Sequence, residues 1–282
     1  MAEPPKPGKL SIVATPIGNL EDVTLRALRV LREAHVIAAE DTRHTRGLLE
    51  RHGIDRPMTS LHEHNEDEKT ATLLGRVLAG ENVALVTDAG TPGVSDPGFR
   101  LIRAARNQGV PVEVVPGPSA VMVAVAGAGL PAEKFAFLGF PPRKGGELAR
   151  WAKDTLSMPI AVVFFESPRR IVDTLTVLAG LDPSRPACVC RELTKRHEEF
   201  LRLPLAELAE ALSRRPEVLG EVTVILGPPL APLVDETPFD VDAEVARLEG
   251  QGKSKKEIAK AIAKVMKRKA SDVYAELIER RR

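Results

Sequence analysis

Short apolar runs alternate with helix-like stretches through the first 120 residues, and this rhythm limits the folds that the chain can adopt. The apolar runs lie at 10–15, 36–41, 58–63, 83–88 and 112–117, and helical spacing of apolar residues marks 43–52, 67–80 and 97–108. Strands separated by helices are typical of a mostly parallel sheet covered by helices. Residues 1–120 therefore predict an α/β domain.

The alternation loosens after residue 120 but does not stop. Strand-like runs follow at 134–140, 160–167, 187–193, 198–203 and 221–227, and helix-like stretches lie near 146–157, 168–180 and 204–214. The run at 198–203 suggests the return strand of a hairpin before a helix, so some pairing is antiparallel. Residues 121–228 therefore predict a second α/β domain with a mixed sheet.

A third, basic unit ends the chain. A proline-rich stretch begins near residue 227, and we assign 229–251 as a linker and 252–282 as two short helices resembling a helix-turn-helix. Ser254 and Glu257 have the spacing of a capping box at the first helix. The predicted apolar stripes are Ile258, Ile262 and Val265 on one helix and Val273, Leu277 and Ile278 on the other.

Charge is distributed unevenly along the chain, whose formal net charge is +1. Residues 252–282 contain eleven Lys or Arg and four Asp or Glu, so they carry +7 and the remainder carries −6. A basic tail on an acidic body favours a polyanionic partner such as nucleic acid. A solvated helical pair without a ligand is the alternative.

Composition favours a soluble cytoplasmic protein without a metal site. No apolar run approaches the roughly 20 residues of a membrane span, and the first ten residues lack a signal-peptide core. Cys188 and Cys190 are two residues apart, so on a strand they share a face, and we expect both to be reduced core residues. The six histidines show no metal-ligand spacing.

Three loops, at 15–22, 88–98 and 116–120, follow strands of the first domain and indicate a binding site. In an open parallel sheet such loops cluster at the carboxyl edge, where ligands bind. None carries a phosphate-binding glycine-lysine motif or the dinucleotide spacing of glycines. Backbone amides with Asp88, Asp96 and Ser119 suit a neutral or cationic ligand better than a triphosphate.

Seven ordered motifs then point to a family. They are "VATPIGNLEDVTLRAL", "AAEDTRHTRGLL", "VTDAGTPGVSDPG", "VPGPSA", "FFESPRRI", "RELTKRHEE" and "GEVTVILG". Over roughly residues 9–227 the chain resembles the tetrapyrrole methylase superfamily, and within it the branch of ribosomal RNA small subunit methyltransferase I. Porphyrin and corrin enzymes have a G-x-G-x-G loop after the first strand, whereas this chain has "TPIGN", which favours the RNA branch.

The resemblance implies that S-adenosylmethionine binds in a cleft between the two α/β domains. By motif position, the cofactor-facing residues would be Pro16, Asp88, Ala89, Gly90, Val94, Asp96, Ser119, Ala120, Phe165, Leu193, Val222 and Thr223. Strand alternation predicts that only one of Phe164 and Phe165 is a plain core residue.

The implied reaction is methyl transfer to a ribose 2′-hydroxyl, for which alignment and a general base both matter. Asp41, at the end of the second strand, is the first candidate base, and Glu166 is the second. For each, a helix cap or an ion pair with a nearby arginine is an equally good interpretation.

RNA contacts would come from basic and polar groups in loops and at strand ends. The candidates are Arg43, Arg46, His62, His64, Asn65, Arg143, Lys144, Arg169, Arg170, Arg191 and Lys195. The resemblance implies a cytidine in the decoding region of 16S ribosomal RNA as the target, and a homodimer. Methylation of a tetrapyrrole or another small substrate, and a non-catalytic RNA-binding assembly protein, stay open as alternatives.

Overall fold

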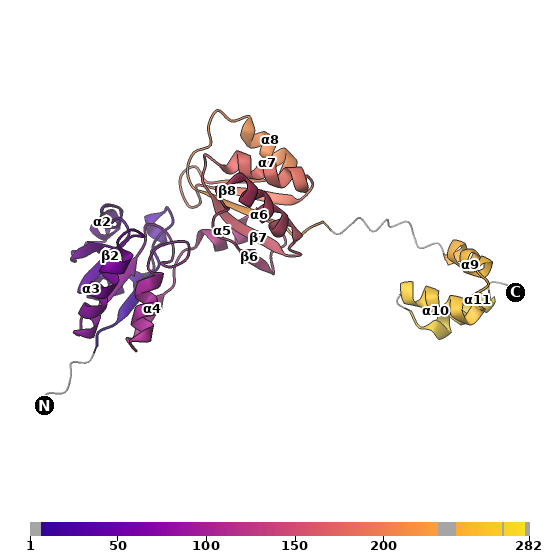
Figure 1. Cartoon of the computed structure of the whole chain (residues 1–282), viewed down its shortest axis with the longest axis horizontal. Coiled ribbons are helices and arrows are strands. Elements are labelled where there is room, and N and C mark those ends of the chain that lie inside the picture. Colours follow the sequence, from indigo (N-terminus) through magenta and orange to yellow (C-terminus); the bar gives the residue numbers. More distant parts are fainter. Residues whose placement is uncertain (1–6, 231–240, 267, 280–282) are drawn as a thin grey trace. The chain divides into compact units, whose positions relative to one another are not determined.

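The computed structural model describes residues 7–230, 241–266 and 268–279 (Figure 1). The chain divides into two compact units, residues 1–230 and 231–282. Unit 1 holds two five-stranded sheets, each at the centre of one lobe. Among the described residues, no helix has the length and apolar character needed to cross a bilayer.

The first lobe is built on a parallel sheet with the strand order β3-β2-β4-β1-β5. Its elements are β1 (Leu10–Val13), η1 (Leu20–Asp22), α1 (Leu25–Glu33), β2 (Val36–Ala39), α2 (Thr42–Arg51), β3 (Met58–Ser60), α3 (Glu66–Leu78), β4 (Val83–Val86), α4 (Phe99–Asn107) and β5 (Val112–Val115). The parallel α/β prediction for this region is confirmed.

Both faces of this sheet are covered by helices. Leu31 of α1 and Leu49 of α2 are buried against one face, while Leu73 of α3 and Leu101 of α4 are buried against the other. Because both faces are covered, strands β2 and β4 are apolar and buried at every position.

The second lobe has a mixed sheet with the strand order β6-β7-β10-β8-β9. Its elements are α5 (Ala120–Gly127), β6 (Phe135–Phe137), α6 (Gly145–Ser157), β7 (Ala161–Glu166), α7 (Ile171–Leu181), β8 (Pro186–Arg191), β9 (Glu199–Pro204), α8 (Leu205–Ser213) and β10 (Val222–Leu226). Only β6 and β7 pair in parallel, and β8 and β9 form the expected antiparallel hairpin.

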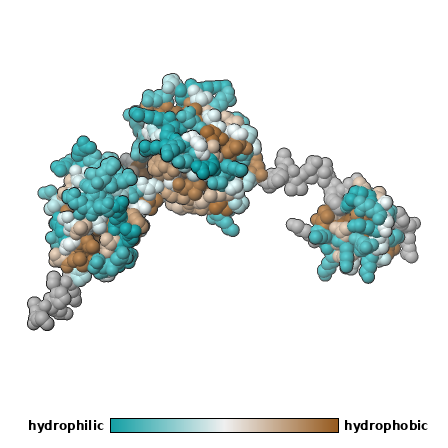
Figure 2. Space-filling model, in the orientation of Figure 1, coloured by the Kyte–Doolittle hydropathy of each residue, from teal (hydrophilic) through white to brown (hydrophobic). Residues whose placement is uncertain are grey.

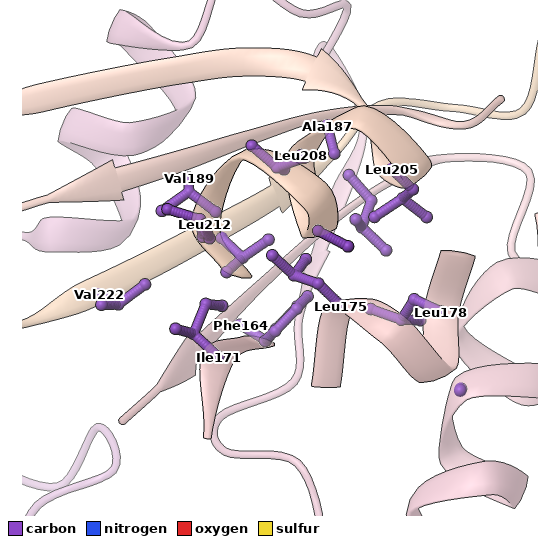
Figure 3. Close-up of a cluster of buried hydrophobic side chains, with 14 of the residues drawn as sticks. Phe164, Ile171, Leu175, Leu178, Ala187, Val189, Leu205, Leu208, Leu212 and Val222 are labelled. Atoms are coloured by element: carbon purple, nitrogen blue, oxygen red, sulfur yellow. The ribbon is translucent and has the colours of Figure 1, made fainter. Parts of the chain in front are cut away.

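One face of the second sheet packs against α6, α7 and α8. Phe164 lies in this cluster with Ile171 and Leu175 of α7 and Leu208 of α8 (Figure 3). Phe165 points to the opposite face and is only partly buried, so the predicted alternation is confirmed.

The opposite face of the second sheet packs against α5 and receives a residue from the first lobe. Cys188 and Cys190 lie on this face as free, fully buried thiols, as predicted. Ile17, from the loop after β1, joins the same cluster beside Val121 and Leu193. The loop at 15–22 therefore ties the two lobes together.

Unit 2 contains three helices in its described residues: α9 (Val241–Gly250), α10 (Lys255–Val265) and α11 (Ala270–Glu279). The predicted linker at 229–251 is wrong over 241–250, because these residues form α9, which packs through Leu248 against α10. Residues 231–240 of the predicted linker lie outside the described residues. The capping box of Ser254 and Glu257 is confirmed.

The predicted apolar stripes of the tail hold only in part. Ile258, Ile262 and Val273 are buried in the core of unit 2. Val265 and Ile278 are instead exposed, since the helices turn these positions away from that core.

Candidate active site

The loop at 88–98 is shaped by backbone conformations that ordinary side chains rarely adopt. Gly90 has φ +84° and forms an isolated two-residue bridge with Thr15, in which each backbone N–H donates to the other residue's carbonyl. At the loop's end, the buried carboxylate of Glu66 accepts hydrogen bonds from the N–H groups of Gly98 and Arg100. The loop is thus fixed at both ends and presents its backbone to the space between the lobes.

A cavity of about 400 Å³ opens between the loops of the two lobes. We name it the first cavity; it is lined by Ile17, Ala89, Gly90, Thr91, Val94, Ser95, Asp96, Ser119, Ala120, Val121, Phe140, Phe165, Glu166, Ser167, Pro168, Gly220, Glu221, Val222 and Thr223. The rings of Phe140 and Phe165 lie 5.5 Å apart, centre to centre, and make one wall aromatic. Such a wall suits the apolar faces of an adenine.

Asp96 places a carboxyl group in this mostly apolar cavity. Burial, and then repulsion from the carboxylate of Glu40, raise the pKa of Asp96 to about 7. The pKa of Glu40 is also raised, chiefly by burial. A cationic ligand beside Asp96 would stabilise its ionised form.

A second cavity, of about 450 Å³, adjoins the first. It is lined by Thr15, Pro16, Ile17, Gly18, Leu20, His44, Thr45, Gly47, Leu48, Thr87, Asp88, Ala89, Lys195 and Glu221. Ile17, Ala89 and Glu221 line both cavities. The hydroxyl of Thr45 is buried without a hydrogen-bond partner, which indicates a polar group that a ligand would satisfy.

Lys195 brings a positive charge to the second cavity. Its ammonium donates to Glu192 at 3.0 Å and to Glu221 at 3.1 Å, and these two carboxylates raise its pKa against the opposing effect of burial. The backbone N–H of Asn19 donates to the Thr194 hydroxyl at 3.1 Å. The first lobe therefore contacts the second beside this lysine.

The structure brings most of the predicted cofactor residues together. The residues in the first cavity are Ala89, Gly90, Val94, Asp96, Ser119, Ala120, Phe165, Val222 and Thr223. Pro16 and Asp88 line the second cavity instead. Leu193 lines neither and is buried in the apolar cluster beside Ile17.

Asp41 lies outside the lining of both cavities. Its side chain accepts from the backbone N–H of Arg43 at the start of α2 and pairs with the Arg43 guanidinium at 2.7 Å. These bonds to Arg43 lower the pKa of Asp41 to about 2. The helix-cap and ion-pair interpretation of Asp41 therefore matches its surroundings.

Glu166 belongs to the first cavity's lining, but its carboxylate is engaged in a buried network. It accepts from the Thr174 hydroxyl at 2.6 Å and from the Ser167 N–H at 2.7 Å, and it pairs with Arg170. Its side chain is fully buried. This geometry fits a role in holding the turn between β7 and α7.

The predicted RNA contacts are scattered, and of this set only Lys195 lines the second cavity. Asn65 accepts from the N–H of His62 and donates to Ser60, so it shapes its own loop beside His64. Arg46 lines a separate surface hollow next to Arg56.

The remaining basic candidates belong to the second lobe. Arg170 donates to the carbonyls of Pro141 and Pro142 and anchors the stretch that leads to Arg143 and Lys144. Arg169 is exposed, and Arg191 pairs with Glu199.

Sequence reasoning missed His44 and Thr45 of the second cavity. Both lie in the motif "AEDTRHTR", three and four residues after Asp41. Residues three and four positions apart lie on the same face of a helix. The spacing of His44 and Thr45 from Asp41 could therefore have identified them as site residues.

Comparisons with known proteins agree with this geometry. Residues 9–209 match the family described as "Tetrapyrrole (Corrin/Porphyrin) Methylases". The chain is 41% identical over 279 residues to ribosomal RNA small subunit methyltransferase I of Mesorhizobium japonicum, covering 99% of this chain and 94% of the relative. It is 48% identical over 221 residues to the Micromonospora olivasterospora protein of that name, covering 78% and 70%.

A solved structure with the same architecture is the uroporphyrin-III C-methyl transferase from Thermus thermophilus complexed with S-adenyl homocysteine. The TM-score is 0.55 at 26% identity, and the match covers 78% of this chain and 97% of the other.

Proposed function

Because the chain belongs to the tetrapyrrole methylase family, and within it to ribosomal RNA small subunit methyltransferase I, we propose that it transfers a methyl group from S-adenosylmethionine to a ribose 2′-hydroxyl of 16S ribosomal RNA. The proposed target is a cytidine of the decoding region. The observation that carries the proposal is the pair of adjoining cavities, one with features suited to the cofactor and one with groups suited to a nucleotide.

The first cavity fits S-adenosylmethionine in size and chemistry. A volume of about 400 Å³ lies within the range of small-molecule sites. Phe140 and Phe165 would bind the adenine, and Asp96 would face a cationic group. When bound, the cofactor supplies an electrophilic methyl group on a sulfonium, so no phosphate-binding loop is needed.

The second cavity fits the acceptor nucleotide. The ammonium of Lys195 has one N–H left after its bonds to Glu192 and Glu221 and would donate it to the nucleotide, and the unpaired hydroxyl of Thr45 would hydrogen-bond to the ribose or base. The shared wall of Ile17, Ala89 and Glu221 would hold the acceptor oxygen against the methyl donor, and this alignment is the main catalytic task in an in-line displacement.

We infer that Asp88, rather than Asp41, accepts the ribose proton. Asp88 lines the second cavity and directly precedes the shared-wall residue Ala89. Its Oδ1 atom accepts from the N–H of Asp41 at 3.0 Å, which fixes the carboxylate in place. His44 is a second candidate proton acceptor in the lining of the second cavity, whereas the carboxylate of Glu221 is paired with Lys195.

Single-turnover methylation with saturating RNA tests this assignment. Asp88→Asn should lower the rate by about 10²- to 10⁴-fold, the range typical of a lost general base. Asp41→Asn is the matched control, because it alters a carboxylate outside both cavities, and it should keep the wild-type rate. A low rate for Asp41→Asn with a wild-type rate for Asp88→Asn would assign the general base to Asp41. A low rate found only in a third variant, His44→Ala, would assign it to His44.

The function itself is tested with small ribosomal subunits from cells that lack the gene. Purified protein and labelled S-adenosylmethionine should place one 2′-O-methyl in the decoding region, mapped by mass spectrometry of RNA fragments. Naked 16S RNA and uroporphyrin III serve as parallel substrates. Methylation of uroporphyrin III, or binding of the cofactor without any RNA methylation, would refute the proposal.

We further propose that the protein acts in the cytoplasm as a homodimer. The exposed apolar side chains of Leu25, Val114 and Met122 support self-association, and Val114 lies on the edge strand β5. Light scattering of the wild type and of Val114→Lys measures this directly, and a monomeric wild type would contradict it.

A further inference from the structure

A cavity of about 320 Å³ lies in unit 2, outside the site of the proposed reaction. It opens between α10 and α11 and is lined by Lys256, Ala259, Lys260, Ala270, Ser271 and Tyr274. The two alanines leave room between the helices, so the longer lysine and tyrosine side chains form its polar and aromatic walls. Lys256, Lys260 and Tyr274 are all exposed to solvent.

The two helices that flank this cavity carry opposite charge. Helix α10 contains four lysines and one glutamate, whereas α11 contains three acidic residues and neither lysine nor arginine. On the face of unit 2 that Figure 2 shows, hydrophilic residues cover much of the surface. The acidic side chains of α11 would repel the phosphates that line the groove of a duplex. A polyanion would therefore approach unit 2 along α10.

Tyr274 is the single tyrosine of the chain, and its position is informative. Its neighbour Val273 is buried in the core of unit 2, while Tyr274 is 38% exposed and lines the cavity. An exposed aromatic ring beside two lysines combines a stacking surface with phosphate-binding charges. Proteins that bind single-stranded nucleic acid use this combination.

We propose that the cavity between α10 and α11 binds one nucleotide of single-stranded RNA, with the base stacked on Tyr274 and the adjacent phosphates on Lys256 and Lys260. The inference rests on the proposed RNA substrate and assigns it a second contact away from the reacting nucleotide. A free anion would satisfy the lysines alone, so the tyrosine is what distinguishes RNA from other polyanions.

The test uses the full-length protein and a fluorescent single-stranded RNA of the decoding region, with a duplex of equal length in parallel. Tyr274→Ala should weaken single-strand binding about fivefold or more, the effect of one lost stacking contact, while Tyr274→Phe should retain it. Lys256→Ala with Lys260→Ala should lower the slope of log affinity against log salt by about 1.4, for two phosphates on a single strand. Lys264→Ala, an exposed lysine of α10 outside the cavity, is the matched control and should have a smaller effect.

A photo-crosslink gives an independent readout. RNA containing 4-thiouridine should crosslink to peptides of α10 and α11, as mapped by mass spectrometry. The proposal is overturned if Tyr274→Ala binds like Tyr274→Phe, if Lys264→Ala matches the double variant, or if the duplex binds equally well with no tyrosine effect. A wild type that binds RNA through Tyr274 but methylates none would refute the proposed function and leave this site standing.

Discussion

Cofactor affinity should rise with pH through the ionisation of Asp96. Its pKa is raised to about 7 in the free protein, because the carboxyl group is buried and is repelled by the charge of Glu40. A cationic ligand such as S-adenosylmethionine binds the ionised form better, so below pH 7 part of the binding free energy is used to remove the proton. Asp96→Asn stays neutral at every pH and should lose this dependence.

The raised pKa sets the size of the effect. With a pKa of about 7, the ionised fraction is about 0.09 at pH 6 and about 0.91 at pH 8, so wild-type affinity should increase about tenfold between them. The ligand's own amino group titrates near this range as well. The ratio of wild-type to Asp96→Asn affinities cancels that contribution and isolates the aspartate.

Isothermal titration calorimetry at pH 6, 7 and 8 measures the cofactor affinity of both proteins.

The pH dependence of the free energy of unfolding gives a second test, and the direction of the expected change is determined by the raised pKa. Because folding raises the pKa of Asp96, the folded protein binds a proton that the unfolded chain releases between about pH 4 and pH 7, and stability falls as pH rises through that window. Asp96→Asn should therefore be more stable relative to wild type at pH 8 than at pH 5. Parallel affinity profiles for the two proteins would refute the reasoning.

Three further outcomes follow from the geometry. Gly90→Val should abolish cofactor binding by calorimetry and lower stability by about 1–2 kcal/mol in urea melts, because φ at Gly90 is +84°; wild-type affinity would remove this loop from the site. Glu166→Gln should lower stability by about 1–3 kcal/mol, since it disturbs a buried network, yet leave cofactor affinity unchanged. Removal of residues 241–282 should keep cofactor affinity and flatten the salt dependence of RNA binding; an unchanged salt slope would show that the tail makes no phosphate contacts.

The fold could be predicted largely from local patterns. Every strand of both sheets overlaps a predicted apolar run, and only β8 and β9 extend one residue beyond theirs, to Pro186 and Pro204. Runs of apolar residues bounded by turn residues are the local signal of a buried strand. The sequence did not predict helix α9, because the proline-rich stretch before it led us to extend the linker to residue 251. The exposure of Val265 and Ile278 depends on which face of α10 and of α11 packs against the core of unit 2, and local sequence patterns do not determine that packing.

The candidate site could be located by sequence, but its side chains could not be oriented. Three loops at one sheet edge, together with motif order, point to the first cavity and to Asp96. Asp41 and Glu166 share the same strand-end position as Asp88, yet Arg43 and Thr174 engage their carboxylates. Those partners are set by rotamers and by the start of the next helix, which strand and loop patterns do not encode.

The two cavities meet where the lobes touch, and the loop at 15–22 contributes to the lining of both. Ile17 is packed in the apolar core of the second lobe, and the next two residues contact the segment that carries Thr194 and Lys195. At Gly18 a Cβ atom would lie 2.6 Å from the Lys195 side chain and 3.0 Å from the Leu193 carbonyl, so only glycine permits this approach. The same contact between the lobes therefore places Lys195 at the second cavity, next to Ile17, which lines both cavities. With the methyl donor in the first cavity and the acceptor in the second, as we propose, this contact would set their relative orientation.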